Sequence, residues 1–67
     1  MNLQTVKNRD KQAANIGARI DMCVAEQRRI GGLAEQLEFS ASDRLYDALR
    51  HMRAAQASLE AAREALA

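Results

Sequence analysis

Mostly apolar residues recur along the first half of the chain at intervals of three and four, which places their side chains on one side of an α-helix. They form two rows whose members are seven residues apart: Val6, Ala13, Ile20, Gln27 and Ala34, and Ile16, Cys23, Ile30 and Leu37. Two such rows are typical of a helix that packs lengthwise against another helix. We therefore predict a helix over residues 3–37, with weak packing before Ala13 because Arg9 interrupts the second row.

The second half carries the more regular pattern. Large apolar residues lie seven apart at Leu45, Met52, Leu59 and Leu66, and alanines lie seven apart at Ala41, Ala48, Ala55 and Ala62. Together the two rows predict a helix over residues 41–66 with one continuous packing stripe. We expect alanine at alternate positions to let the first helix approach closely, and the same stripe to contact another chain.

A turn is predicted at residues 38–42. Ser40 and Ser42 are good residues for a helix N-cap, and Ser40 followed by Asp43 resembles a capping box. The pair Gly31-Gly32 precedes this turn. Each glycine costs about 1 kcal/mol relative to alanine inside a helix, but the apolar rows keep their phase across the pair. We predict that the helix continues through it, and the alternative is a break at the pair.

Composition places the chain in the all-α class, because it has no proline and is rich in alanine, leucine, glutamine, glutamate and arginine. We predict one domain, residues 1–67, folded as a two-helix antiparallel hairpin that resembles a coiled coil. A chain this short buries only about 60% of its unfolded surface, and one cysteine allows no internal disulfide. We therefore expect oligomerisation to complete a helical bundle. The predicted interface residues are Ala41, Leu45, Ala48, Met52, Ala55, Leu59, Ala62 and Leu66, with Ile16, Ile20 and Ile30.

One residue of this packing pattern is polar. Gln27 stands where the pattern calls for an apolar side chain. A polar residue at such a position can fix the register or the oligomeric state at a cost in stability. The alternative is that the helix surface is simply exposed at this point.

The sequence offers little for catalysis or metal binding. Cys23 and His51 are the only residues of their kinds, whereas a structural zinc site takes four such ligands. Cys23 falls in a packing row, where cysteine behaves as a small buried apolar residue. We expect a non-enzymatic protein with no catalytic residues, no cofactor and no metal.

Charge and hydropathy narrow the range of partners. The net charge is +1, with ten basic and nine acidic residues interspersed, unlike the clearly basic balance of most nucleic-acid binders. No apolar run approaches the roughly 20 residues of a membrane span, and no secretory leader pattern is visible. We expect a cytoplasmic protein that does not bind membranes.

Residues 33–50 also fit a helix-turn-helix pattern. In that interpretation, Leu45 and Leu49 form the buried side of a recognition helix. Asp43 and Asp47 argue against it, because they would repel phosphates where contacts are needed. A DNA-binding regulator therefore stays as the alternative function, beside a small phage- or plasmid-encoded inhibitor of a host protein.

The chain resembles one known group in outline. Its length, the turn at 38–42 and the second helix rich in arginine, alanine and leucine (45–60) resemble the small helical-hairpin co-chaperones of type III secretion needle subunits. The resemblance implies that the stripe on the second helix faces a larger helical-repeat chaperone, and that the two together keep a needle subunit from polymerising. The leading expectation is a protein–protein interaction module, an adaptor or chaperone-like subunit in a homodimer or hetero-oligomer.

Overall fold

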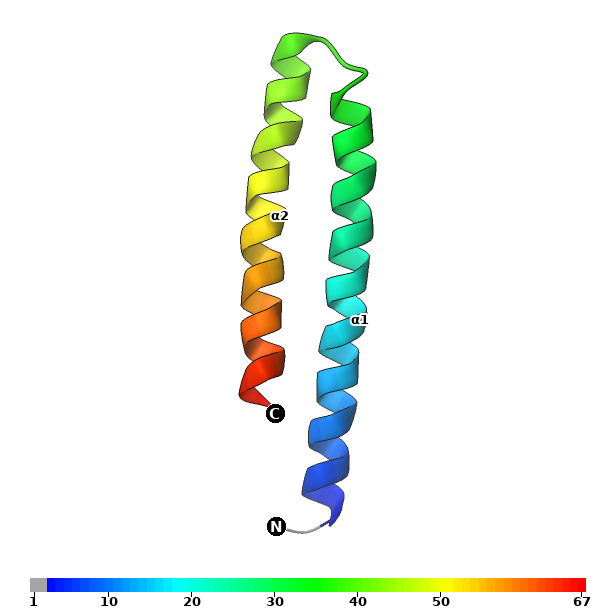
Figure 1. Ribbon diagram of the computed structural model, residues 1–67, viewed down its shortest axis with the longest axis vertical. Helices are drawn as coiled ribbons and strands as arrows, with labels where there is room; N and C mark the ends of the chain where they lie inside the picture. The colour runs from blue at the N-terminus through cyan, green and yellow to red at the C-terminus, as the bar shows by residue number, and fades with distance from the viewer. Residues whose placement is uncertain (1–2) are drawn as a thin grey trace.

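Two long helices make up the structure, a computed structural model that describes residues 3–67, with side chains from residue 8 onward. Helix α1 (Leu3–Ala34) and helix α2 (Phe39–Ala65) lie side by side and antiparallel (Figure 1). The molecule measures 56 × 15 × 10 Å, one helix thick in its thinnest direction. The prediction of an all-α antiparallel hairpin is confirmed.

Helix α1 is continuous through Gly31 and Gly32, as predicted, and the alternative of a break at the pair is wrong. It ends at Ala34, three residues before the predicted end at residue 37. The last turn tightens: the N–H of Gln36 donates to the carbonyl of Leu33 and the N–H of Leu37 to that of Ala34. Such i to i−3 bonds commonly close the end of an α-helix.

The connection between the helices lies earlier than predicted. It comprises residues 35–38, and α2 begins at Phe39, so the predicted turn at 38–42 is wrong. Glu38 is the N-cap, with an extended backbone and no side-chain capping bond. Ser40 and Ser42 stand inside the helix, and the predicted capping box is wrong. The hydroxyl of Ser42 donates instead to the carbonyl of Ala34, at 2.9 Å, and satisfies an end carbonyl of α1.

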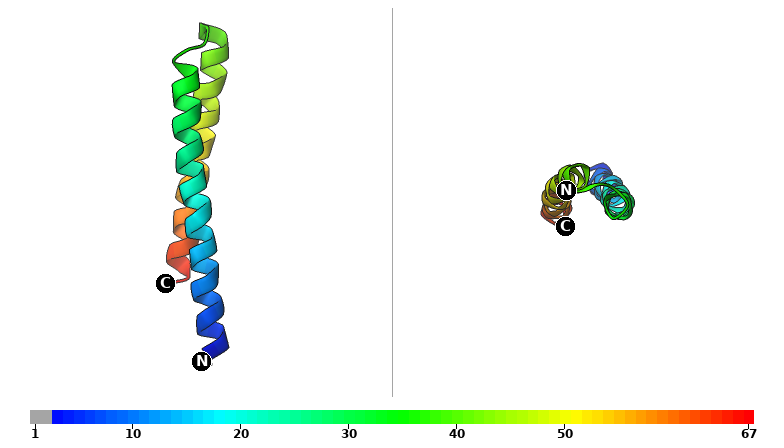
Figure 2. Two further views of the ribbon diagram at one scale, coloured as in Figure 1. Left: turned by 90° about the vertical axis from the view of Figure 1, so that its right-hand side faces the viewer. Right: turned by 90° about the horizontal axis from the view of Figure 1, so that it is seen from above.

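The helices differ in length, and α1 extends past the end of α2 (Figures 1 and 2). Arg9 belongs to this extension and is exposed. A charge at this packing position therefore does not interrupt the hairpin, because α2 has already ended. Val6, the first member of the predicted rows, lies outside the residues whose side chains are described.

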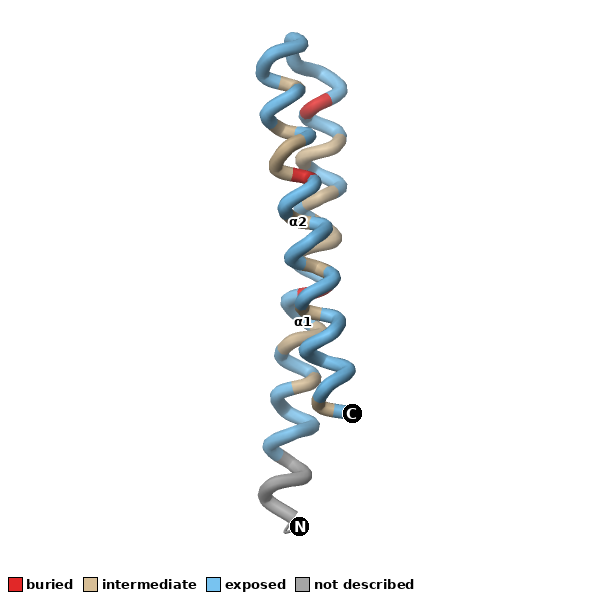
Figure 3. Tube along the Cα trace, turned by 90° about the vertical axis from the view of Figure 1, so that its left-hand side faces the viewer, coloured by how far each residue is buried: buried red, intermediate tan, exposed pale blue. Residues whose placement is uncertain are grey.

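The buried positions are few and lie apart along the length of the hairpin (Figure 3). Among the residues whose side chains are described, only Ile20, Ala34 and Leu49 are buried. Neither of the two described helices is long and apolar enough to cross a membrane.

The antiparallel arrangement bears on the helix-turn-helix interpretation of residues 33–50. Helices in that motif meet at about 90–120°. Here α1 and α2 run alongside each other from the connection onward (Figure 2). The segment therefore does not adopt the geometry that presents a recognition helix to DNA.

Continuity through the glycine pair generates a first prediction. A Cβ built on Gly31 or on Gly32 meets nothing within 4 Å. We expect Gly31→Ala and Gly32→Ala each to raise the free energy of unfolding by about 0.5–1 kcal/mol, measured by urea denaturation. The matched control is Ala18→Gly at an exposed position of α1, which should lower it by a similar amount. A loss of stability in the alanine variants would show that this space is occupied.

Candidate interaction surface

The contact row of α1 is the one that the sequence predicts. Ile20 and Ala34 are buried, and the other members are half-buried: Ala13, Ile16, Cys23, Gln27 and Ile30. The predicted packing residues Ile16, Ile20 and Ile30 thus all face α2. Leu37 is 41% exposed, because it lies in the connection after α1 has ended.

The contact row of α2 agrees with the sequence prediction only in part. The large residues Leu45, Met52, Leu59 and Leu66 are half-buried against α1, as predicted. The alanine row, defined here as Ala41, Ala48, Ala55 and Ala62, does not form the rest of the hairpin contact. Three of these alanines are exposed and only Ala48 is half-buried. The predicted close hairpin contact through alanine is therefore wrong.

A different row completes the contact of α2. Its members are Ser42, Leu49, Gln56 and Arg63, one position further along the chain than the alanine row. Leu49 is the most buried residue of α2, at 5% exposure. Both rows lie three and four residues from the large apolar residues, so either one can complete a packing stripe. The structure places the alanine row beside the contact between the helices, where it stays open to another molecule.

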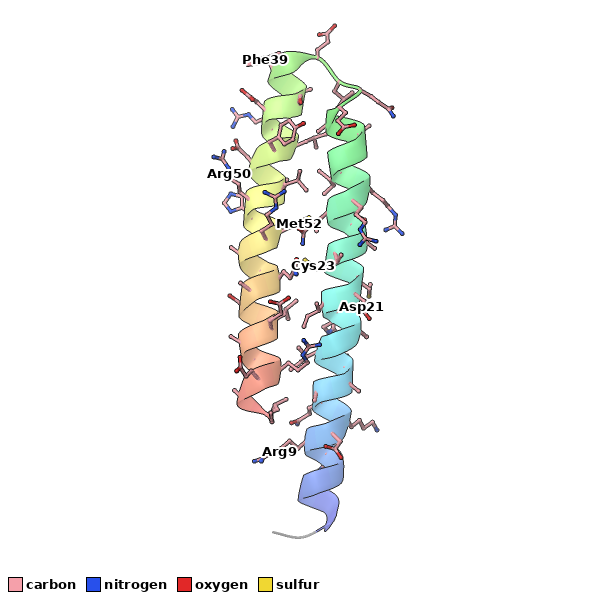
Figure 4. The ribbon with its side chains drawn as sticks, viewed as in Figure 1. Arg9, Asp21, Cys23, Phe39, Arg50 and Met52 are labelled. Atoms are coloured by element: carbon pink, nitrogen blue, oxygen red, sulfur yellow. The ribbon has the colours of Figure 1, made fainter. Side chains whose placement is uncertain are left out.

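Polar groups bridge the helices near the middle of the hairpin. The amide of Gln27 donates to the side-chain oxygen of Gln56 at 2.7 Å. The Cys23 thiol donates to the backbone carbonyl of Met52 at 3.4 Å, and both side chains lie between the helices in Figure 4. Gln56 also donates to Glu60 at 3.0 Å. Gln27 is half-buried and bonded across the contact, which favours a role in fixing the register over simple exposure.

Nearer the open end, an arginine packs over a glycine. A Cβ built on Gly17 would lie 3.7 Å from a guanidinium nitrogen of Arg63. The sequence pattern does not predict this contact, because the charge of Arg63 favours a solvent-facing position. Long basic side chains can lay their aliphatic part along an apolar contact while the charge reaches water. Arg63 is exposed overall, which fits that arrangement.

The hairpin leaves large apolar side chains uncovered. They are Met22 at 70% exposure, Leu33 at 48%, Leu37 at 41%, Tyr46 at 46% and Phe39 at 83%. Figure 4 shows Phe39 projecting outward from the start of α2. Four of the five lie within residues 33–46, so the apolar surface concentrates toward the closed end.

One long side of the hairpin carries the alanine row of α2 beside an exposed row of α1. We call this side the alanine face. Its α1 members are Arg19, Met22, Glu26, Arg29 and Leu33, all exposed. A groove of about 490 Å³ opens on this side between Met22 and Met52, and a second of about 380 Å³ lies between Ile16 and Leu66. Arg19 lines both grooves, which places them on one continuous surface.

The opposite side of the hairpin is more polar. A groove of about 410 Å³ there is lined by Val24, Tyr46 and Leu49 together with Arg28, Glu35 and Arg53. A neighbouring groove on α2 is lined by Asp43, Asp47, Arg50 and Arg53 with Tyr46 and Leu49. Asp47 and Arg50 form an ion pair, as their spacing on a helix suggests. The alanine face is therefore the less charged of the two sides.

The cysteine and the histidine of the chain occupy different surroundings. His51 is exposed, and the Cys23 thiol is engaged with a backbone carbonyl inside the hairpin. No group of three histidine, cysteine, aspartate or glutamate side chains converges there on a shared point. What the described residues offer is a packing surface.

The glutamine pair generates a second prediction. Gln27→Leu alone should lower the free energy of unfolding by about 1 kcal/mol, because it leaves the Gln56 oxygen without its donor. Gln27→Leu with Gln56→Leu should recover or exceed the original stability, since two leucines replace two partly desolvated amides. Urea denaturation of both single variants and the double variant gives a double-mutant cycle. Additive effects would show that the bond does not couple the helices.

A third prediction tests which row packs in the hairpin. Leu49→Ala should lower the free energy of unfolding by about 2 kcal/mol or more, because it opens a space in the only buried line. The same replacement at Leu37, which is 41% exposed, should change it by less than about 0.5 kcal/mol. Chemical denaturation measures both variants. Equal effects at the two positions would contradict the assignment of Leu49 to the contact row.

The candidate interaction surface has three distinctive parts: the polar bridge of Gln27 and Gln56, the buried Leu49 and the uncovered alanine face. Comparison of the chain with models of protein families, with curated protein sequences and with solved structures found no match.

Proposed function

We propose that this chain is a non-enzymatic protein–protein interaction module, an adaptor or chaperone-like subunit that works within a homo- or hetero-oligomer. The observation that carries the proposal is the surface that the hairpin leaves open. Its accessible surface is 5374 Å². A compact monomer of 7.4 kDa exposes about 4,200 Å², so the excess is roughly 1,200 Å².

The shape of the hairpin supports the same proposal. The radius of gyration is 16.1 Å, whereas a compact domain of this length has about 11 Å. Two helices share only one line of contact, and each can bury only one narrow stripe against the other. A third or fourth helix would cover the remaining apolar side chains, as in a helical bundle.

The chemistry of the open surface favours a protein partner. Met22 and Phe39 are mostly exposed, and large exposed apolar groups commonly mark interaction sites. The surrounding charges are of both signs, including the ion pair of Glu26 with Arg29 at 3.1 Å. A mixed rim around apolar side chains is the usual anatomy of a protein–protein interface.

A solution measurement tests the proposal as a fourth prediction. We expect the purified chain to associate, and its melting temperature to rise with protein concentration over a roughly hundredfold range, because association stabilises the folded state by mass action. Sedimentation equilibrium gives the mass, and circular dichroism gives the melting curve. An alternative acceptable result is a chain that is poorly folded alone and gains helix on addition of a partner.

One outcome would sink the proposal. A monomer of 7.4 kDa that melts cooperatively, with a melting temperature independent of concentration, would show that the hairpin needs no partner for its stability.

A further inference from the structure

We infer that the partner is a second copy of this chain, and that the alanine face packs on the same face of that copy around a two-fold axis. This inference rests on the proposed function and specifies it. The axis lies in the face and crosses both helices at right angles. Helix α2 therefore packs antiparallel to α2 of the second copy, and α1 antiparallel to α1, in a four-helix bundle.

The register of the hairpin relates positions on α1 to positions on α2. Level residues of two antiparallel helices have residue numbers that add to a constant. Contacts that cross the hairpin give 75 for Cys23 with Met52, 76 for Ala34 with Ser42 and 83 for Gln27 with Gln56. The mean is 78, so residue 27 of α1 lies about level with residue 51 of α2.

The alanine row of α2 is symmetric about that level. Its midpoint falls between residues 51 and 52, because it runs from Ala41 to Ala62 in steps of seven. The two-fold axis therefore sets Ala48 opposite Ala55 of the second copy, and Ala41 opposite Ala62. Small residues that meet in this way let two helices approach closely along four turns or more, with no large side chain to displace.

The exposed row of α1 has its midpoint between residues 27 and 28, within about one residue of the same level. Glu26 and Arg29 lie on either side of residues 27 and 28, so each faces the oppositely charged residue of the second copy. Met22 and Leu33 are likewise equidistant from the axis, and each apolar side chain faces the other. These two are 70% and 48% exposed in the isolated hairpin, and the pairing covers both. Charge, apolar surface and small residues thus share one centre of symmetry.

The area that a compact dimer has to bury agrees with a dimer of this kind. Two separate hairpins expose about 10,700 Å², twice 5374 Å², whereas a compact protein of twice 7.4 kDa exposes about 7,000 Å². A compact dimer of this chain therefore buries about 3,700 Å² in total. Obligate homodimers typically bury at least about 2,000 Å². The opposite side of the hairpin would bring more charge into such an interface, because Asp43, Asp47 and Arg50 lie there in addition to Arg28, Glu35 and Arg53.

Cross-linking tests the position of the axis. His51 lies next to the axis and is exposed, so His51→Cys in a Cys23→Ala background should form a disulfide-linked dimer under mild oxidation. Arg44→Cys and Ser58→Cys lie seven residues away on either side, on the same row of α2. Neither should cross-link with itself, whereas an equal mixture of the two should give the mixed dimer.

Charge placement tests the face. Ala55→Glu puts a carboxylate in the centre of the interface and should weaken dimerisation by about tenfold or more. Ala54→Glu is the matched control, since it adds the same charge to the neighbouring, exposed position that points away from the face. Sedimentation gives the mass and circular dichroism confirms that each variant is helical. Glu26→Arg should weaken the dimer severalfold, and Glu26→Arg with Arg29→Glu should restore it.

The outcomes separate this inference from the function on which it rests. A dimer that loses affinity with Ala55→Glu and not with Ala54→Glu, and that cross-links through residue 51, supports both. An oligomer that is indifferent to Ala55→Glu, or that cross-links through residue 44 or 58 alone, overturns the two-fold face and leaves the interaction module standing. A chain that gains helical structure only with a different protein also overturns the two-fold face and leaves the interaction module standing. A stable monomer overturns both.

Discussion

The fold depends on a single line of contact between two helices. Isolated helices are marginal in water, so α1 and α2 owe most of their stability to each other. Ile20 and Leu49 lie on this line and are among the few buried residues of the described chain. Because no second layer covers the hairpin, each residue of the line carries a large share of the folding free energy. The same geometry leaves the outer side chains uncovered.

The polar bridge limits how the two helices can align. An apolar contact row with a seven-residue repeat packs almost as well when one helix slides by two turns. Gln27 and Gln56 oppose such a slide, because their bond forms only in one register. Ser42 acts in the same way at the closed end, where its hydroxyl reaches the last carbonyl of α1. The hairpin thus gives up apolar burial in its middle and gains a defined alignment. A defined alignment matters for any partner that binds across both helices.

The sequence predicts the all-α class, the antiparallel hairpin, the continuous α1 and the contact row of α1. Each of these depends on a seven-residue spacing of apolar positions that extends along the whole helix. The sequence does not determine which of two rows of α2 packs against α1 beside the large residues. The large residues Leu45, Met52, Leu59 and Leu66 have alanines on one side and Ser42, Leu49, Gln56 and Arg63 on the other. Both choices satisfy the same spacing, and the alanine row looks cleaner. The burial of Leu49 against α1 decides between the two rows. That contact joins residues far apart in the sequence, so the local pattern of α2 does not predict it. The start of α2 differs from the prediction for a similar reason. The hydroxyl of Ser42 bonds to the carbonyl of Ala34 in α1 and does not cap its own helix.

Helix α2 carries a third row beside its hairpin contact. The large residues and the row of Leu49 turn toward α1, and the alanines turn toward the open side. On a helix these rows are neighbours, so the large residues lie where the hairpin contact and a second contact would meet. A four-helix bundle places its core at that meeting point. The isolated hairpin leaves the alanine half of the stripe unused, whereas a partner on the alanine face makes both halves structural.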